Sequence, residues 1–290
     1  NTASGYYSLN CNTTGNYNNA VGLFSLRCNC TGSYNNAFGY TALHKNSASD
    51  NNAFGHAALH DNTTGSYNTA VGTCTLYANT TGAQNTGVGY KALAANTCGN
   101  CNTGIGYRAL ATNTTGSSNT ATGRNALVAN TTGSRNTVSG YRAAQATTTG
   151  GMNTVMGTRS LYFNTTGSLN SAFGDWALRG NTTGSNNTAS GYKALYANTT
   201  ASLNTAIGAQ SIASNTTGNS LVAVGYCSLK TNTTGSDNVA IGVESLRFNT
   251  TGSSNVVVGK DAAQCNTTAN NNVAIGLKAG TLNKTGTGNV

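Results

Sequence analysis

The sequence predicts an all-β fold, a parallel β-solenoid (β-roll) of about seventeen 17-residue coils. One observation is a glycine, here the marker glycine, that follows Asn-Thr-Ala-x or a close variant. It recurs seventeen times between Gly5 and Gly276, and every spacing is 17 residues except one of 16, between Gly39 and Gly55. A fixed short period over a whole chain indicates a repeat architecture, and this period is too short for a pair of helices.

Local sequence supplies two more observations. Each unit contains a strand signal of the kind Asn-Thr-Ala-Val-Gly, as in residues 68–72, and a turn signal, Asn-Thr-Thr-Gly-Ser, rich in corner residues. Proline is absent, as expected where nearly every segment donates to a backbone ladder. The repetition has no linker, so we expect one uninterrupted domain over 1–290, with one shortened repeat at 39–54 and no visible caps.

Equivalent positions of successive units form columns, and these predict the interior. The leucine column, four residues after the marker, is Leu in thirteen units between Leu9 and Leu246. The small-residue column, two before the marker, holds only Ala, Gly or Val, whereas the apolar column just before the marker varies among Val, Ile, Phe, Met, Thr and Ser. Adjacent strand residues point to opposite faces, so these last two columns cannot share one interior. We therefore expect one of them to face another chain.

Asparagine fills two further columns. The first asparagine column, four before the marker, is interrupted only by Leu221 and predicts a ladder of stacked amides that includes Asn18–Asn272. The second asparagine column, seven after the marker, is interrupted only by Thr147. Fourteen of its members begin an Asn-x-Thr acceptor sequence for N-glycosylation, at a corner that we expect to be exposed. A turn built from Asn, Thr and Gly also creates such sequences by composition alone, so their occupancy stays open. The candidate glycosylation sites are Asn12, Asn29, Asn62, Asn79, Asn113, Asn130, Asn164, Asn181, Asn198, Asn215, Asn232, Asn249, Asn266 and Asn283.

The net charge of +9 comes from 15 basic and 6 acidic residues. A broken basic stripe lies two residues after the marker, at Lys91, Arg108, Arg142, Arg159, Lys193 and Lys278. It is either a solvated face that keeps a fibre of low charge soluble or a surface attracted to acidic polysaccharide or nucleic acid. We expect no nucleic-acid partner, because no stacking aromatics are interleaved with the stripe.

The sequence predicts no enzyme and no cofactor. Carboxylates occur at most once per repeat and never as a pair at matching columns, which a two-carboxylate site requires. His44 and His60 share a column in neighbouring coils, which suggests either a divalent-metal site or a solvated ladder. No run of about 18 apolar residues occurs, so we expect no membrane insertion.

Four of the eight cysteines are disulfide candidates. Cys11 and Cys28 occupy one column in adjacent coils, and Cys98 and Cys101 form a Cys-Gly-Asn-Cys corner. Disulfides would fit an oxidising, extracellular setting. Tyrosine follows the marker in seven units, either as a platform for carbohydrate or as half-buried strand aromatics stacked on their neighbours.

The segments Asn238-Val-Ala-Ile-Gly242 and Asn272-Val-Ala-Ile-Gly276, with the recurring Asn-Thr-Ala-Val-Gly, resemble the head repeats of trimeric autotransporter adhesins. They are also similar to repeats in some phage and viral tail-fibre proteins. The resemblance implies a left-handed parallel β-roll, usually trimeric, displayed outside a cell. Plant ice-binding β-rolls, with Asn-x-Val-x-Gly coils, look similar as well.

We therefore expect an extracellular or cell-surface structural fibre or adhesin shaft, a fibril or biofilm component that contacts glycans, cell surfaces or other chains. An ice-binding β-solenoid and a phage or viral tail-fibre shaft are the alternatives. Both ends of the sequence fall within the repeat, almost in phase, and soluble solenoids cover their open ends with caps. We therefore expect the chain to associate with itself, end to end and also laterally, as a trimer or a filament.

Overall fold

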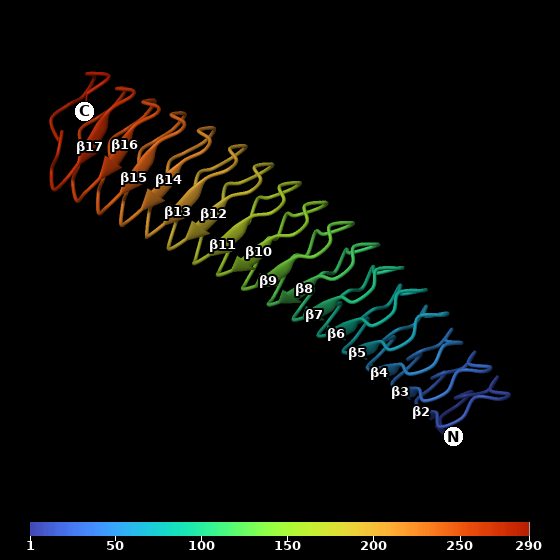
Figure 1. The fold of residues 1–290 in the computed structure, drawn as a ribbon. Coiled ribbons are helices and arrows are strands. Elements are labelled where there is room, and N and C mark those ends of the chain that lie inside the picture. Colours follow the sequence, from blue (N-terminus) through green and yellow to red (C-terminus); the bar gives the residue numbers. More distant parts are fainter. Residues whose placement is uncertain (290) are drawn as a thin grey trace. The chain divides into compact units, whose positions relative to one another are not determined.

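The computed structural model describes residues 1–289, and this part of the chain is all-β with no helix. The fold class is confirmed: seventeen three-residue strands, one per repeat, form a parallel β-solenoid (Figure 1). They are β1 (Thr2–Ser4), β2 (Asn19–Val21), β3 (Asn36–Phe38), β4 (Asn52–Phe54), β5 (Thr69–Val71), β6 (Thr86–Val88), β7 (Thr103–Ile105), β8 (Thr120–Thr122), β9 (Thr137–Ser139), β10 (Thr154–Met156), β11 (Ser171–Phe173), β12 (Thr188–Ser190), β13 (Thr205–Ile207), β14 (Val222–Val224), β15 (Val239–Ile241), β16 (Val256–Val258) and β17 (Val273–Ile275).

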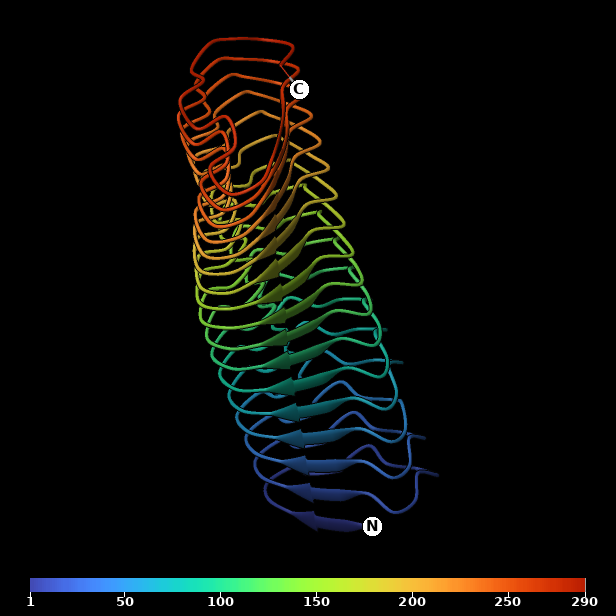
Figure 2. The ribbon, with the colours of Figure 1, turned by 60° about the vertical axis from the view of Figure 1, so that its left-hand side comes forward.

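The coils form two compact units, Asn1–Thr149 with β1–β9 and Gly150–Val290 with β10–β17. Within each unit every strand pairs in parallel with the strand one coil away, without a shift in register: Thr103 faces Thr120, for example. Figure 2 shows the strands of the first unit, blue to green, as successive parallel arrows along one side of their coils. The extent of a single domain over 1–290 stays a prediction.

The coil that begins at Gly106 shows how the chain turns after a strand. Two tight turns follow β7: the Ala109 amide donates to the Gly106 carbonyl (3.3 Å) and the Asn113 amide to the Leu110 carbonyl (3.1 Å). Hydrogen bonds between coils continue through these turns, as from the Leu110 amide to the Ala126 carbonyl (3.1 Å). The ladder of hydrogen bonds between coils therefore extends beyond the three-residue strands.

Three non-glycine residues of this coil adopt the left-handed backbone conformation: Arg108 (φ 56°), Leu110 (φ 53°) and Ser118 (φ 58°). Each such residue costs on the order of 1–3 kcal/mol and persists only where the surrounding structure over-determines it. Here the surroundings are the hydrogen-bonded coils on either side, which repeat the same conformation at the same positions.

The marker glycine is required for two reasons. Gly106 has a φ of 130°, a conformation that side chains disfavour. A Cβ at this position would also lie 2.7 Å from the carbonyl oxygen of Gly123 in the next coil. Successive coils therefore approach each other too closely at the marker column to admit a side chain.

The interior is formed by the leucine column and the small-residue column, as shown by Leu110 and Ala121, both 0% exposed. The apolar column points outward instead: Phe54 is 41% exposed and Ile105 is 40% exposed. Of the two strand columns, the apolar column is therefore the one that faces outward. The smaller side chains line the thin coil, and the larger ones cover its outside.

The first asparagine column is buried and forms the predicted ladder. The Asn102 Oδ1 accepts from both the backbone amide (3.0 Å) and the side-chain Nδ2 (3.2 Å) of Asn119 in the next coil. The Asn119 Nδ2 also donates to the Gly133 carbonyl (2.9 Å). At the interruption, the Leu221 amide still donates to Asn204 Oδ1 (2.9 Å), and its side chain is buried.

The shortened repeat loses one residue from its corner and nothing from its interior. The Ala48 carbonyl accepts from Asn35 Nδ2 (2.8 Å), so Ala48 takes the place that Gly116 has in a full coil. Asn46 Nδ2 reaches that carbonyl two residues further on (2.7 Å), whereas Asn113 reaches the Gly116 carbonyl three residues further on (2.9 Å). The missing residue is therefore one of the two outer corner positions.

Candidate functional site

The expected exposure of the candidate glycosylation sites is wrong. Twelve of the fourteen asparagines are buried, with exposed fractions of 0–1%, and Asn12 and Asn283 are half-buried. The twelve are Asn29, Asn62, Asn79, Asn113, Asn130, Asn164, Asn181, Asn198, Asn215, Asn232, Asn249 and Asn266. Only the residues after them reach the outside: Thr114 is half-buried and Thr115 is exposed.

The second asparagine column is an interior ladder. Asn113 Nδ2 donates to Asn96 Oδ1 of the preceding coil (2.8 Å) and to the Gly116 carbonyl (2.9 Å). Its Oδ1 accepts from Asn130 Nδ2 of the following coil (2.7 Å). A glycan on this nitrogen would remove one of its two donors and would have to leave a closed interior. The twelve buried side chains therefore hold the corner together and present no acceptor nitrogen on the surface.

The disulfide candidates Cys11, Cys28, Cys98 and Cys101 are free thiols, as are the other four cysteines. Residues in one column carry parallel Cα–Cβ bonds, so the Cβ atoms of Cys11 and Cys28 stay about one strand spacing, ~4.8 Å, apart. A disulfide needs them at about 3.5–4.5 Å with the bonds converging. Cys98 and Cys101 have different partners: the Cys101 thiol donates to Gln84 Oε1 (3.2 Å), and the Thr97 hydroxyl lies 3.8 Å from Cys98 Sγ.

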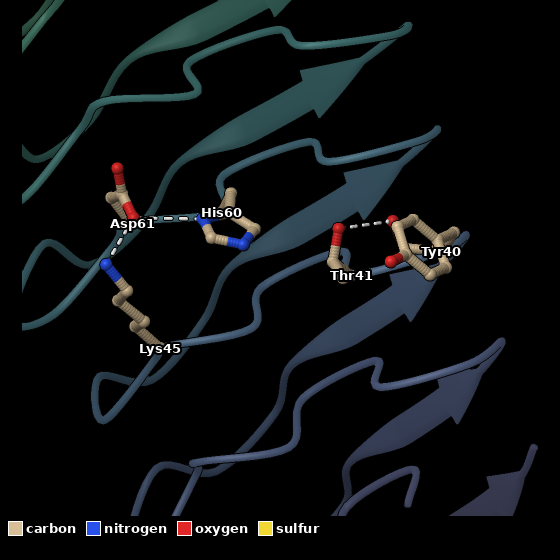
Figure 3. A network of polar contacts seen from close by, with 5 residues as sticks. All are labelled: Tyr40, Thr41, Lys45, His60 and Asp61. Atoms are coloured by element: carbon tan, nitrogen blue, oxygen red, sulfur yellow. Dashed lines mark hydrogen bonds and ion pairs between the residues drawn. The ribbon is translucent and has the colours of Figure 1, made fainter. Parts of the chain in front are cut away.

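A polar cluster surrounds Asp61, in the coil that follows the one containing His44. Lys45 Nζ (2.7 Å) and His60 Nδ1 (2.9 Å) both contact Asp61 Oδ1 (Figure 3). Burial acts to raise the pKa of Asp61, but the hydrogen bonds from Lys45 and His60 outweigh it and lower the pKa below its ordinary value of 3.8. The hydrogen bond to Asp61 raises the pKa of Lys45 above its ordinary value of 10.5. The cluster fastens two coils to each other.

His44 and His60 form a stacked pair of imidazole rings. Their rings lie 5.1 Å apart with an interplanar angle of 6°, and Tyr77 continues the stack at 5.0 Å from His60. Parallel rings direct their nitrogens side by side and not toward a common point. Residues 1–289 contain no group of three or more His, Cys, Asp or Glu side chains that could hold a metal. Desolvation, followed by the charge of His60, lowers the pKa of His44 below its ordinary value of 6.5.

The outward-facing apolar column forms an exposed hydrophobic feature. In the first unit it is uninterrupted through six consecutive coils: Val21, Phe38, Phe54, Val71, Val88 and Ile105. Five of the six are 38–41% exposed, and Phe38 and Phe54 stack at 5.0 Å with an interplanar angle of 5°. Strict register makes this a straight ridge of hydrocarbon on the outside of the sheet.

The tyrosines that follow the marker also lie outside, in the turn and not in the strand. Tyr90 is 42% and Tyr107 is 45% exposed, and their rings stack at 5.4 Å. Cations lie over such rings, as Lys91 does over Tyr90 (5.3 Å) and Arg124 over Tyr107 (5.5 Å). The statement that no aromatics are interleaved with the basic stripe is therefore wrong. Arg124 was missed because it lies one residue, not two, after its marker, and its spacing of one coil from Tyr107 was the signal.

A second aromatic and cationic cluster lies in the other unit. The Lys193 ammonium lies 5.0–5.6 Å from the rings of Trp176, Tyr192 and Tyr196. The Arg179 guanidinium contacts the same Trp176 and Tyr196 rings and donates to the Tyr196 hydroxyl (3.1 Å). Because every one of these side chains has a neighbour from an adjacent coil, the contacts brace the coils as well as forming a surface.

Comparison of the chain with known protein families, curated proteins and solved structures finds no match. Within residues 1–289 no helix is long and apolar enough to cross a membrane. The described surfaces are ridges and rows and not enclosed pockets of reactive groups. Their chemistry suits contact with another extended surface.

Proposed function

We propose that the chain is a structural element of an extracellular fibre or adhesin shaft, in which coils pack side by side with other chains. The apolar column is the observation that supports the proposal. Its six successive outward-facing residues form one hydrophobic ridge, and an exposed apolar patch of this kind is typical of an interaction surface. Assignment to a cell-surface adhesin or to a phage or viral fibre depends on the resemblance of the Asn-Thr-Ala-Val-Gly repeats. Glycans or cell surfaces are the proposed targets of such a fibre.

The free energy gained by burying this ridge against another chain adds up along successive coils. About two-fifths of Phe54 and of Ile105 remain exposed in the single chain, so covering each contributes on the order of 0.6–1.2 kcal/mol. One residue would not hold two chains together, because association costs several kcal/mol of lost freedom. A ridge that continues through six consecutive coils adds the small gains in register. Lateral assembly, as a trimer or a filament, follows from this repetition.

The test replaces two ridge residues by charges, as Phe54→Glu with Ile105→Glu. The expected result is a lower mass by size exclusion with light scattering, with an unchanged circular dichroism spectrum. The matched control is Thr64→Glu with Thr115→Glu, which places the same charges on exposed corner positions of the same two coils. If both pairs changed the mass equally, or neither did, the ridge would not be the interface.

Ice binding is the second candidate, favoured by one specific observation. The first positions of β5–β9 form an in-register threonine ladder of Thr69, Thr86, Thr103, Thr120 and Thr137. These residues are two positions from the apolar column, so they share its outward face. A freezing-point hysteresis that Thr103→Leu with Thr120→Leu abolishes would support this function. No hysteresis at millimolar concentration would exclude it.

A further inference from the structure

The charges of this chain are unevenly distributed along its sequence. Between Asp61 and Asp175 the sequence contains no Asp or Glu, yet it contains six Lys or Arg residues. Four of them define what we call the cation row: Lys91, Arg108, Arg124 and Arg142. They belong to four consecutive coils of the first unit, one cation per coil.

The cation row follows one edge of these coils. The Arg108 amide donates to the Tyr90 carbonyl (2.9 Å) and the Arg142 amide to the Arg124 carbonyl (3.0 Å), so the row's residues lie on directly neighbouring rungs. Lys91, Arg108 and Arg124 are exposed, and Arg142 is half-buried. Successive cations therefore rise by about one strand spacing, ~4.8 Å; Lys91, Arg108 and Arg142 share one column, and Arg124 lies one residue before that column.

Tyrosine rings contact three of the four cations, and no carboxylate pairs with any of them. Lys91 lies over Tyr90 (5.3 Å), Arg124 over Tyr107 (5.5 Å) and Arg142 over Tyr141 (5.3 Å). Such contacts orient a cation and leave its outer N–H groups open to an anion. The three ion pairs found within residues 1–289 involve only Lys45, His60, Asp61, Glu244 and Arg247.

We infer that the cation row binds an anionic polysaccharide with one carboxylate per sugar ring, a polyuronate. Such a chain is extended and carries one carboxylate on every sugar; because successive sugars are rotated about the chain axis, the carboxylates that face one side recur every two or three sugars. Each carboxylate that faces the row accepts hydrogen bonds from the nearest cations, most strongly from the arginine guanidinium groups. The inference deepens the proposed surface-contact role and rests on it for the extracellular setting in which such polymers occur.

Two features favour a polyuronate over a nucleic acid. The Tyr90 and Tyr107 rings stack on each other with an interplanar angle of 17°, so their facing surfaces are not free to stack on bases, as single-strand binding requires. The phosphates of a duplex follow a helical path, so a straight row of four cations would meet only a few of them. An extended polymer runs alongside the row over its whole length, so the carboxylates on that side come within reach of the cations.

The same column elsewhere in the chain shows that the row is not a general property of the repeat. Two residues after the marker, four consecutive coils of the second unit carry Gln210, Cys227, Glu244 and Asp261. The backbone there has the same left-handed conformation, with φ between 53° and 56°. The fold therefore does not require cations at this column, and the row is a local feature of its own.

The experiment measures binding of the full chain to immobilised polygalacturonate at low and physiological salt. The row variant combines Lys91→Gln, Arg108→Gln, Arg124→Gln and Arg142→Gln. The control variant combines Arg135→Gln, Lys230→Gln, Lys260→Gln and Lys284→Gln, so both variants lower the net charge of +9 by four. We expect the row variant to weaken binding at least about tenfold and to flatten its salt dependence, and the control to change affinity less than about threefold.

A second probe separates the chemistry from net charge. Fully methyl-esterified polygalacturonate has the same sugars without carboxylates, and we expect no binding to it. Equal losses in the row and control variants, or undiminished binding of the ester, would overturn the inference. So would tighter binding of single-stranded or duplex DNA than of polygalacturonate at equal charge concentration. None of these outcomes depends on chain mass, so lateral assembly is tested separately by light scattering on the same variants.

Discussion

Replacing Asn113 by Ala tests the buried asparagine ladder at a site where every partner is known. Asn113 Nδ2 donates to Asn96 Oδ1 (2.8 Å) and to the Gly116 carbonyl (2.9 Å), and Asn130 Nδ2 donates to Asn113 Oδ1 (2.7 Å). The asparagine side chains of all three coils are 0% exposed, so water cannot replace the lost contacts without opening the coil.

The magnitude follows from which partners lose their last hydrogen bond. The Gly116 carbonyl keeps the bond from Asn102 Nδ2 (2.8 Å), and Asn130 Nδ2 keeps its bond to the Gly133 carbonyl (2.9 Å). The truncation therefore orphans Asn96 Oδ1 and one N–H of Asn130. At about 1–3 kcal/mol for each buried unsatisfied group, the unfolding free energy of these coils should fall by about 2–6 kcal/mol.

The assay is native-state hydrogen exchange of the amides in the coils around residue 113, because a repeat protein opens locally and one global unfolding energy is not defined for it. The control is Thr115→Ala, which removes an exposed side chain two residues away and should change stability by less than about 0.5 kcal/mol. Equal exchange rates in the two variants would show that the ladder does not stabilise the coil. The ladder also has a natural interruption at Thr147, which stands where the next asparagine would be. There the Asn130 Oδ1 is buried without a hydrogen-bond partner.

Three further predictions concern the core, the marker glycine and pH. Leu110→Asp should unfold its neighbouring coils, because a buried unpaired charge costs several kcal/mol. Leu169→Asp, at a corner residue that is 49% exposed, should leave thermal unfolding unchanged. Equal melting temperatures of the two variants would show that the assigned interior is wrong. Gly106→Ala should destabilise the chain strongly, because residue 106 has a φ of 130° and the new Cβ would lie 2.7 Å from a carbonyl oxygen of the next coil. The control is Gly104→Ala, in a column that is mostly Ala, and it should be tolerated. Denaturant unfolding of the two variants measures the difference. The lowered pKa of His44 means that the folded state resists its protonation, so stability should fall as pH drops through 6.5, and His44→Gln should abolish that part of the pH dependence of the melting temperature; an unaltered pH profile would contradict this.

The parts of the fold that follow from periodicity could be predicted from the sequence. The spacing of the marker glycines gives the coil, and the leucine column identifies the core, because both depend on residue type at a fixed interval. The pairing register follows as well, since equivalent residues of identical coils stack directly. The left-handed backbone of Leu110 could not be predicted, because local propensity disfavours it and only the hydrogen bonds of neighbouring coils enforce it.

The candidate sites were harder to predict, because residue type does not determine the direction of a side chain at a corner. Asn113 and Thr115 belong to one Asn-Thr-Thr-Gly turn, yet the first is buried and the second is exposed. A turn composition predicts the bend but not which of its residues points inward. Likewise, Cys11 and Cys28 share a column, but parallel Cα–Cβ bonds, a consequence of strict stacking, keep their thiols apart. The Asp61 cluster depends on contacts between coils that no single repeat contains.

Lateral association through the apolar column is the central claim, and sedimentation equilibrium of the unaltered chain tests it most directly. At micromolar concentration the claim predicts a mass that is a multiple of the 29.3 kDa chain and rises with concentration. It also predicts that the mass falls to that of one chain when Phe54 and Ile105 both carry glutamate. A single species of 29.3 kDa over the whole concentration range, with the ridge exposed to water, would contradict it.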